Sequence, residues 1–450
     1  MSLVNEKSSV VALPELEVFE TIPFQAQIEE SFTEELIPQS QLNTGAFVEF
    51  LIKTAENEFI KPSDTLLQSR SRIKLRKVNN STVTAEDWKK VSLVNNIGHS
   101  MWQQVDVLIG ESQTTASLPT YPYKAYINSI ITTSKEAKET YQILSGFSDE
   151  DFESETSIHA PNSKITNLIT PIATASDKSL GRICELWTPL CIDLFKQPKN
   201  LIGGLNLKIR LVPARSEFLF MSSDLNIIPS IHFEDIYLHV NQKTVTGDVS
   251  LGILQGLMIS PAKYPINRCE VRSHTIDTGT SIRNLDNMII GTMPRRVYLA
   301  LTSNVGFAGS YDKNPFYFYH YHISSIACYV NSQIVGKRAQ KPDYDLPYFM
   351  KEYINFLKVS GQFNNSIQTT ITPQKYFKGF TIFAFDLTRD QSEGFHKSGY
   401  IDAPQKFSNL RFTIHFKVPL AETISAIIYT EWDDQLCIDA MKNGFLSNSN

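Results

Sequence analysis

Apolar and polar residues alternate strictly in many short stretches of this chain, and two of the stretches resemble each other. Residues 205–211 (LNLKIRL) and 410–418 (LRFTIHFKV) place apolar side chains at every second position. This period of two predicts strands with one buried and one exposed face. Each stretch follows an apolar-Asp-Leu run, at 192–194 in the first half and at 385–387 in the second, and then a loop that contains glycine. We therefore expect two related β domains.

Similar strand signals fill both halves of the chain. Strands are predicted at 47–52, 72–76, 105–110, 182–194, 205–211 and 231–240, and again at 268–276, 296–302, 314–326, 380–387, 410–418 and 424–432. One segment with helical spacing interrupts each half, from Tyr123 to Gly146 and from Phe349 to Leu357. Roughly eight antiparallel strands with long connections are typical of a jelly roll, although the spacing also permits other β-sandwiches. The predicted fold class is all-β, with two consecutive eight-stranded antiparallel jelly rolls and short inserted helices.

The length of the chain supports this division. Its 450 residues exceed the ~250–300 at which a single core stops growing. We expect an N-terminal arm at 1–30, a first jelly roll at 31–245, a linker at 246–262 and a second jelly roll at 263–450. The linker is inferred from its three glycines and one proline. The acidic and polar stretch 149–177 is expected to form a long surface loop at a domain tip.

Composition narrows the possible functions. The 27 Phe and 18 Tyr favour strands over helices. A formal charge of −5, without a run of Lys or Arg, argues against direct genome packaging by this chain. The five cysteines form no CxxC pair, which indicates reduced, mostly buried thiols and synthesis inside a cell. No signal peptide or long apolar window is present, so we expect a soluble protein that is not secreted by the usual route.

The strongest candidate for chemistry is His320-Tyr321-His322. On the strand predicted at 314–326 the two imidazoles would share a face, as the metal-binding pair of cupin enzymes does. Such a site also needs a carboxylate and a third histidine, and residues 323–333 contain no Asp or Glu. Two histidines packed among aromatic residues are therefore favoured. A bicupin-like metal-dependent enzyme centred on His320 and His322 is the alternative.

Other polar clusters have simpler explanations. We interpret Asp433-Asp434 as a solvated strand end and the acidic run at 149–155 as a solvated loop, because that run lacks the spacing of a calcium site. No phosphate-binding glycine motif and no GxSxG elbow occur in the chain. We therefore assign no catalytic, cofactor-binding or metal-binding residue, and we expect no enzyme activity.

Several segments, taken together and in order, carry a resemblance to a known family. They are 94–107 (VNNIGHSMWQQVDV), 121–126 (YPYKAY), 144–147 (LSGF), 264–271 (YPINRCEV), 314–318 (NPFYF) and 379–388 (GFTIFAFDLT). The set resembles the major capsid protein of Polinton/Maverick elements and adintoviruses, in the double jelly-roll lineage that includes virophage coats and adenovirus hexons. The similarity extends over residues 16–445.

The resemblance implies a homotrimer with a pseudo-hexagonal outline that tiles the facets of an icosahedral shell around a DNA genome. Its implied partners are other copies of the chain and a single jelly-roll penton or minor capsid protein. Its implied location is the virion, with assembly inside the host cell. The loops at 149–177 and 303–315 would be tower or contact elements, and the arm would run beneath the barrels or to a neighbour. A carbohydrate-binding spike is a further alternative, which would not form flat hexagonal arrays.

Overall fold

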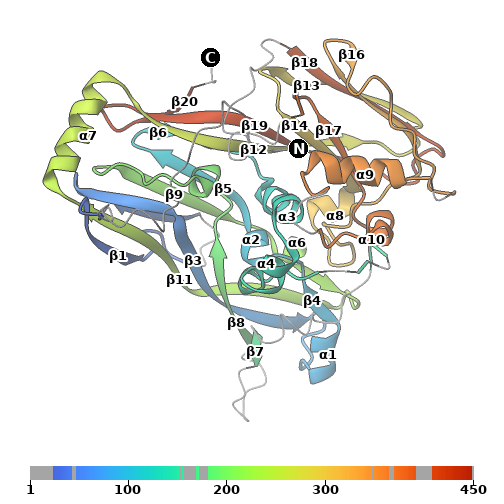
Figure 1. Ribbon diagram of the computed structural model, residues 1–450. Helices are drawn as coiled ribbons and strands as arrows, with labels where there is room; N and C mark the ends of the chain where they lie inside the picture. Colours follow the sequence, from blue (N-terminus) through green and yellow to red (C-terminus); the bar gives the residue numbers. More distant parts are fainter. Residues whose placement is uncertain are drawn as a thin grey trace, which may run out of the picture.

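The computed structural model of the chain (Figure 1) describes residues 24–42, 47–149, 151–152, 154–156, 169–171, 181–346, 348–363, 369–391 and 408–447. The arm predicted at 1–30 therefore lies mostly outside the described residues, and its last three residues belong to the first strand, Ile28–Leu36. Much of the loop predicted at 149–177 also lies outside them.

Two antiparallel sheets make up the first half. One sheet has the order β1 (Ile28–Leu36), β11 (Ile227–Val245), β3 (Glu58–Lys77), β8 (Arg182–Pro189) and β7 (Ile169–Pro171). The other has the order β2 (Val48–Lys53), β9 (Asn206–Pro213), β5 (Trp102–Ile109) and β6 (Ser112–Gln113). A separate pair joins β4 (Val91–Leu93) to β10 (Phe220–Ser222).

The second half repeats this arrangement. One sheet has the order β12 (Ala262–Ile276), β19 (Ile424–Ile438), β14 (Arg296–Ser303) and β17 (Ile382–Asp386), and the short β20 (Gly444–Leu446) pairs with β19. The other has the order β13 (Ile282–Gly291), β18 (Ser408–Phe416), β15 (Ile323–Val330) and β16 (Gln333–Ile334).

The strand order is the same in both halves. When the short β4, β7, β10 and β20 are set aside, eight strands remain in the described part of each half, with sheet orders 1-8-3-6 and 2-7-4-5. The two sequence copies noticed first become β9 and β18, which hold the seventh place in their halves. Two sheets of four strands connected in this way form a jelly roll.

Helices enter at equivalent places in the two halves. α3 (Tyr121–Thr132), α4 (Lys135–Glu139) and the 3-10 helix η2 (Gln142–Ser145) lie between β6 and β8, and α9 (Met350–Val359) and α10 (Pro373–Lys378) lie between β16 and β17. The prediction of a single helix up to Gly146 was wrong, because α3 ends at Thr132 and the next residue, Thr133, is extended. Ser134 then caps α4 by accepting a hydrogen bond from the Ala137 N–H at 3.3 Å.

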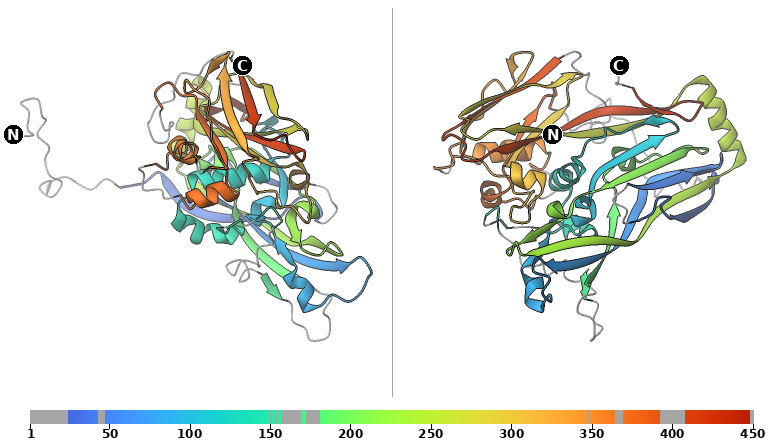
Figure 2. Two further views of the ribbon diagram at one scale, coloured as in Figure 1. Left: turned by 90° about the vertical axis from the view of Figure 1, so that its right-hand side faces the viewer. Right: turned by 180° about the vertical axis from the view of Figure 1, so that it is seen from behind.

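The remaining helices connect or cover strands. They are α1 (Ala85–Lys89), α2 (Ile97–Ser100), the 3-10 helix η3 (Asp193–Lys196), α6 (Ser216–Leu219), α7 (Gly247–Ile259) and α8 (Asn304–Ala308). α7 occupies most of the predicted linker and separates β11 from β12 at the edge of the molecule (Figures 1 and 2). No helix of the described residues is long and apolar enough to cross a membrane.

The strand predicted at 314–326 was wrong over most of its length. β15 begins only at Ile323, and Tyr321 and His322 have φ angles of 42° and 48°, which place them in a turn. The alternation of Phe316 and Phe318 had suggested a strand. Both rings are buried in a connection beneath α3, so their spacing reflects tertiary packing.

The sheet that contains β14 and β19 is covered on both faces. This sheet lies between its partner sheet and the helices α3, α8 and α9 (Figure 1). Consequently every residue of β14 is buried, whereas β9 alternates between buried and partly exposed residues. The buried hydrophobic side chains form one cluster that extends through both halves.

Candidate functional site

The junction between the two halves is built around α3. Tyr126 is fully buried and stacks on Phe316 with ring centroids 4.2 Å apart. Tyr123 stacks on Phe307 at 5.2 Å and meets Phe218 edge-on at 5.9 Å. Phe307 and Phe316 belong to the second half, so aromatic packing joins the halves through one helix face.

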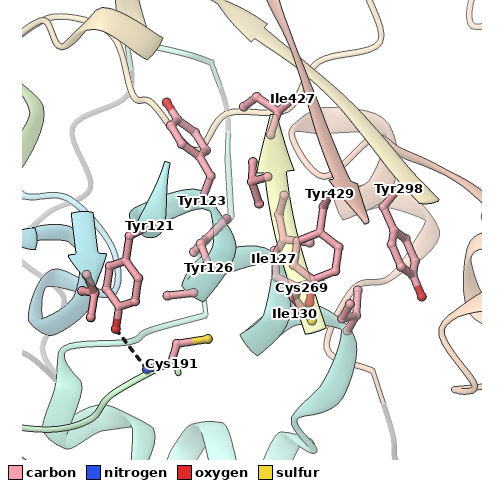
Figure 3. Close-up of a cluster of buried hydrophobic side chains, with 14 of the residues drawn as sticks. Tyr121, Tyr123, Tyr126, Ile127, Ile130, Cys191, Cys269, Tyr298, Ile427 and Tyr429 are labelled. Carbon is pink, nitrogen blue, oxygen red and sulfur yellow. Dashed lines mark hydrogen bonds between the residues drawn. The ribbon is translucent and has the colours of Figure 1, made fainter. Parts of the chain in front are cut away.

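Hydrogen bonds fix the same helix against the second half. Asn128 donates from Nδ2 to the Tyr429 hydroxyl on β19 at 3.2 Å. Gln362, after α9, donates from Nε2 to the Ile130 and Ile131 carbonyls at 3.1 and 3.0 Å. Figure 3 shows Ile127 and Ile130 of α3 beside Tyr429 and Cys269. These bonds set the rotation of α3 relative to β19.

α3 also takes part in a buried ionic cluster. Lys124 Nζ is 2.8 Å from Asp193 Oδ2, and the same oxygen accepts a hydrogen bond from the Cys269 N–H at 3.0 Å. Asp193 therefore connects α3 and η3 of the first half to β12 of the second half. Burial by itself would lower the pKa of Lys124, but the neighbouring carboxylate outweighs burial and raises it. The lysine stays charged at neutral pH.

A second polar group adjoins this cluster. The Tyr121 hydroxyl accepts a hydrogen bond from the Cys191 N–H at 3.0 Å (Figure 3). The same hydroxyl lies 3.0 Å from His99 Nδ1. Burial, with a smaller contribution from Lys196, lowers the pKa of His99 to about 3. Because the imidazole is then neutral, its Nδ1 can accept the hydroxyl proton of Tyr121. The group is a satisfied internal network.

Two cavities border the junction. One of about 250 Å³ is lined by Lys124, Asp193, Arg268 and Glu270, among others, and has room for water beside the unpartnered Asp193 Oδ1. The other, of about 880 Å³, is lined in part by Tyr123, Phe218 and Phe307. Across the described residues, no group of three or more His, Cys, Asp or Glu side chains could hold a metal ion.

His320 and His322 are adjacent, but in a different way from the predicted one. His320 is 1% exposed, stacks on Tyr344 at 4.1 Å, and accepts a hydrogen bond at Nδ1 from the His322 N–H at 3.1 Å. Burial, and then the nearby His322, lower the pKa of His320 to about 3. His322 points to Asp345, with Nδ1 and Oδ1 3.0 Å apart. Since Nδ1 of His320 is occupied and the rings are perpendicular, this arrangement is typical of packed histidines.

The interpretation of Asp433-Asp434 as a solvated strand end was wrong. Both residues lie within β19, and Asp434 is 2% exposed. Asp433 Oδ1 is 2.9 Å from Arg295 Nη1, and Asp434 Oδ2 is 3.0 Å from Arg268 Nε. The carboxylates are therefore neutralised by arginines on neighbouring segments. By contrast, the expected burial of the cysteines is confirmed, since all five are buried and free.

Comparison with known proteins gives a consistent result for the fold. No family model matches the chain. The uncharacterized protein F54H12.2 of Caenorhabditis elegans is 25% identical over 358 residues, which cover 78% of this chain and 80% of that protein.

Solved structures match over almost the full length. The Sputnik virophage structure has a TM-score of 0.62 and 13% identity, and covers 100% of this chain and 95% of its own. The PBCV-1 virus capsid has a TM-score of 0.59 and 10% identity, with 96% and 100% covered. The mavirus major capsid protein has a TM-score of 0.55 and 11% identity, with 100% and 97% covered. Together with the repeated strand order, these matches show that the chain has the double jelly-roll fold found in these capsid structures.

Proposed function

We propose that this chain is the major capsid protein of an icosahedral virus or virus-like element with a DNA genome. Three copies would form a pseudo-hexagonal capsomer, and capsomers would tile the facets of the shell. The observation that carries the proposal is the repeated strand order in the two halves. A ring of three chains that each hold two equivalent jelly rolls presents six similar sides, which suits hexagonal tiling.

The junction around α3 supports this role mechanically. A capsomer needs its two rolls at a constant angle, because each roll contacts different neighbours in the shell. Stacked aromatics, the Asp193 connection and the hydrogen bonds of Gln362 all cross the junction. They make independent movement of the halves costly, because packed interiors resist deformation.

Charge and composition agree with a shell component. With a formal charge of −5, the chain leaves neutralisation of the genome to other components.

We propose a first roll at 31–245, a second at 263–450, and a linker at 246–262 that is largely the helix α7. On the resemblance of the quoted segments we further propose the Polinton/Maverick and adintovirus lineage, a single jelly-roll penton or minor capsid partner, and assembly inside the host cell.

The test is the solution mass of the purified full chain by light scattering, followed by negative-stain imaging of the same peak. The proposal predicts a mass of about 153 kDa, three times the 51.0 kDa of one chain, and hexagonal outlines or spherical shells. The proposal would be contradicted by a protein that stays monomeric at every concentration and also forms no trimers when it is co-expressed with the penton protein.

Metal analysis of the same sample tests the bicupin alternative. That alternative requires a stoichiometric transition metal that is lost in His322→Ala and retained in His232→Ala, a change of an exposed histidine on β11. The capsid proposal predicts no difference between the two variants.

A further inference from the structure

The helices α9 and α10 leave apolar side chains exposed at the surface. Tyr348, Met350 and Ile354 are 67%, 45% and 39% exposed. Met350 and Ile354 are four residues apart on α9 and therefore lie on the same face of the helix. The other face of α9 packs on β17 and carries the fully buried Phe356. Exposed apolar side chains that gather in this way are typical of a protein contact.

A cavity of about 520 Å³ lies beside these residues. It is lined mostly by apolar and aromatic side chains, and its lining comprises Tyr344, Asp345, Phe349, Met350, Pro373, Gln374, Phe377 and Lys378. The carboxylate of Asp345 is already paired, with Lys417 Nζ at 2.6 Å and with His322 Nδ1 at 3.0 Å. Lys378, by contrast, forms no ion pair with another described residue. The cavity therefore combines apolar walls with an unpaired positive charge.

Further lysines surround the cavity. Lys351 and Lys358 of α9 are exposed, and neither forms an ion pair with another described residue. The acidic residue of α9, Glu352, is 2% exposed and contributes no charge to the surface. The surface made by Tyr348, the exposed side of α9 and the cavity, which we call the α9–α10 face, is thus apolar and positively charged.

The strand β1 carries the opposite charge. It is the edge strand of its sheet and pairs with β11 on one side and with no described strand on the other. Glu29, Glu30 and Glu35 are exposed and form no ion pair with another described residue. Ile37, just after the strand, is 70% exposed, and the proline that follows it favours an extended backbone. Because Glu35 and Ile37 are two residues apart, they share a face at a distance of about 7 Å.

These two surfaces lie far apart on one chain. Figure 1 shows α9 and α10 at one side of the molecule and β1 at the other, and the view from behind in Figure 2 agrees. They can therefore meet only between copies. A contact between two different surfaces of identical chains is heterologous, and it forms a closed ring when its rotation allows. A ring of three copies would place the first roll of each copy against the second roll of the next.

We propose that β1 of one copy docks on the α9–α10 face of the next copy in the trimer. Ile37 would enter the cavity of about 520 Å³, and Glu35 would pair with Lys378 in the cavity wall. An apolar anchor in a pocket beside a complementary charge is the usual centre of a specific interface. This inference rests on the proposed capsid function, since it names the contact that closes the ring.

Charge exchange in the full chain tests the contact, with trimer dissociation followed by analytical ultracentrifugation. Glu30→Lys/Glu35→Lys should raise the concentration at which half of the trimer dissociates by at least about tenfold, because like charges then face each other. Lys351→Glu/Lys378→Glu should have the same effect from the other surface. The variant with all four changes restores opposite charges and should return to within about threefold of the unchanged protein.

The matched control is Glu111→Lys/Asp277→Lys, which reverses two exposed carboxylates outside both surfaces. It should leave the dissociation of the trimer unchanged. A trimer that neither reversal weakens, or that the four changes together fail to restore, would overturn this contact and leave the capsid function standing. An unchanged protein that forms no trimer at all would overturn both.

Disulfide trapping tests the position of Ile37. The variant Ile37→Cys/Met350→Cys should give covalent dimers and trimers under mild oxidation, because the native cysteines are buried. In the control Ile37→Cys/Met441→Cys the second thiol replaces a residue that is 84% exposed between β19 and β20, and it should stay monomeric. Trapping at monomer mass, or equal trapping in the control, would refute the proposal.

Discussion

Replacing Asp193 by alanine should destabilise the protein strongly, because it removes a carboxylate that joins α3, η3 and β12. Lys124 Nζ, 2.8 Å away, would keep its charge but lose its partner, and the Cys269 N–H would lose its acceptor. The Lys124 side chain is 15% exposed, so water can replace the carboxylate only in part. Breaking a buried ion pair by removing one partner costs about 3–5 kcal/mol, and we expect Asp193→Ala to fall in that range.

The assay is the midpoint of urea unfolding at one protein concentration, compared among three variants. Asp193→Asn retains an oxygen that can accept the hydrogen bond from the Cys269 N–H, but it has no charge to neutralise Lys124. If the ion pair contributes more than this hydrogen bond, the variant should still lose about 2–3 kcal/mol of unfolding free energy. Asp64→Ala breaks a pair with Lys61 in which both side chains are more than a third exposed, and it should cost less than about 1 kcal/mol.

The same pair predicts the response to alkaline pH. The raised pKa of Lys124 means that its stabilising contribution is complete below the unfolded-state value of about 10.4 and is lost as the pH rises through the folded-state value. The unchanged protein should thus lose stability above about pH 10.4 more steeply than Asp193→Ala does. If Asp193→Ala unfolds within about 1 kcal/mol of the unchanged protein, the junction is hydrated and the reasoning is refuted.

Three further predictions concern a buried histidine, a buried tyrosine and a pair of glycines. Burial lowers the pKa of His99 to about 3, so the free energy of unfolding should fall as the pH drops below about 6.5, by roughly 2 kcal/mol at pH 5. In His99→Gln the urea midpoints measured at pH 7 and at pH 5 should differ less than in the unchanged protein. Tyr126→Ala should cost about 3–5 kcal/mol in the same assay, because it removes a fully buried ring stacked on Phe316. Gly98→Ala should destabilise the protein by about 1–3 kcal/mol in thermal unfolding, because the new β-carbon would lie 2.2 Å from Thr188 Oγ1. Gly252→Ala has open space around its β-carbon and should stabilise the protein by up to about 1 kcal/mol, because alanine favours a helix more than glycine does.

The alternation of apolar residues was sufficient to find the strands that have one exposed face. β2, β5, β9 and β18 each overlap a predicted strand, and the repeat of β9 and β18 led to the two-roll architecture. The first part of β3 was missed because Pro62, Ser63 and Asp64 suggest a turn. In the structure these residues lie where the pairing of β3 with β11 is interrupted. The proline has no N–H to donate, but no hydrogen bond between the strands is needed at this position.

β13 was missed for a related reason. Its register shifts between Leu285 and Ile289, and the extra residues break the period of two. The prediction of a strand at 314–326 failed for the opposite reason, because the buried rings of Phe316 and Phe318 produce an alternating pattern outside a strand. Local periodicity cannot separate these cases, since they depend on residues distant in sequence.

The junction itself was hardly visible in the sequence. Lys124, Asp193 and Cys269 are far apart along the chain, and no spacing rule links them. Asp193 was noticed as the polar member of an apolar-Asp-Leu run, and Lys124 and Cys269 lie in two of the segments that carry the family resemblance, but no sequence pattern placed the three residues together. The partners of Asp193 became evident only from the packing of α3 against η3 and β12.

The long separation between the two sides of the junction has a consequence during synthesis of the chain. Asn128 on α3 bonds to Tyr429, which is 301 residues later. At about 5–20 residues per second, a ribosome adds those residues in roughly 15–60 s. Phe307 and Phe316, the stacking partners of Tyr123 and Tyr126, are themselves added only about 10–40 s after these tyrosines, although the strands of the first half are complete at Val245. The nascent first roll thus exposes these aromatic rings for many seconds, and during this time they are open to non-native contacts.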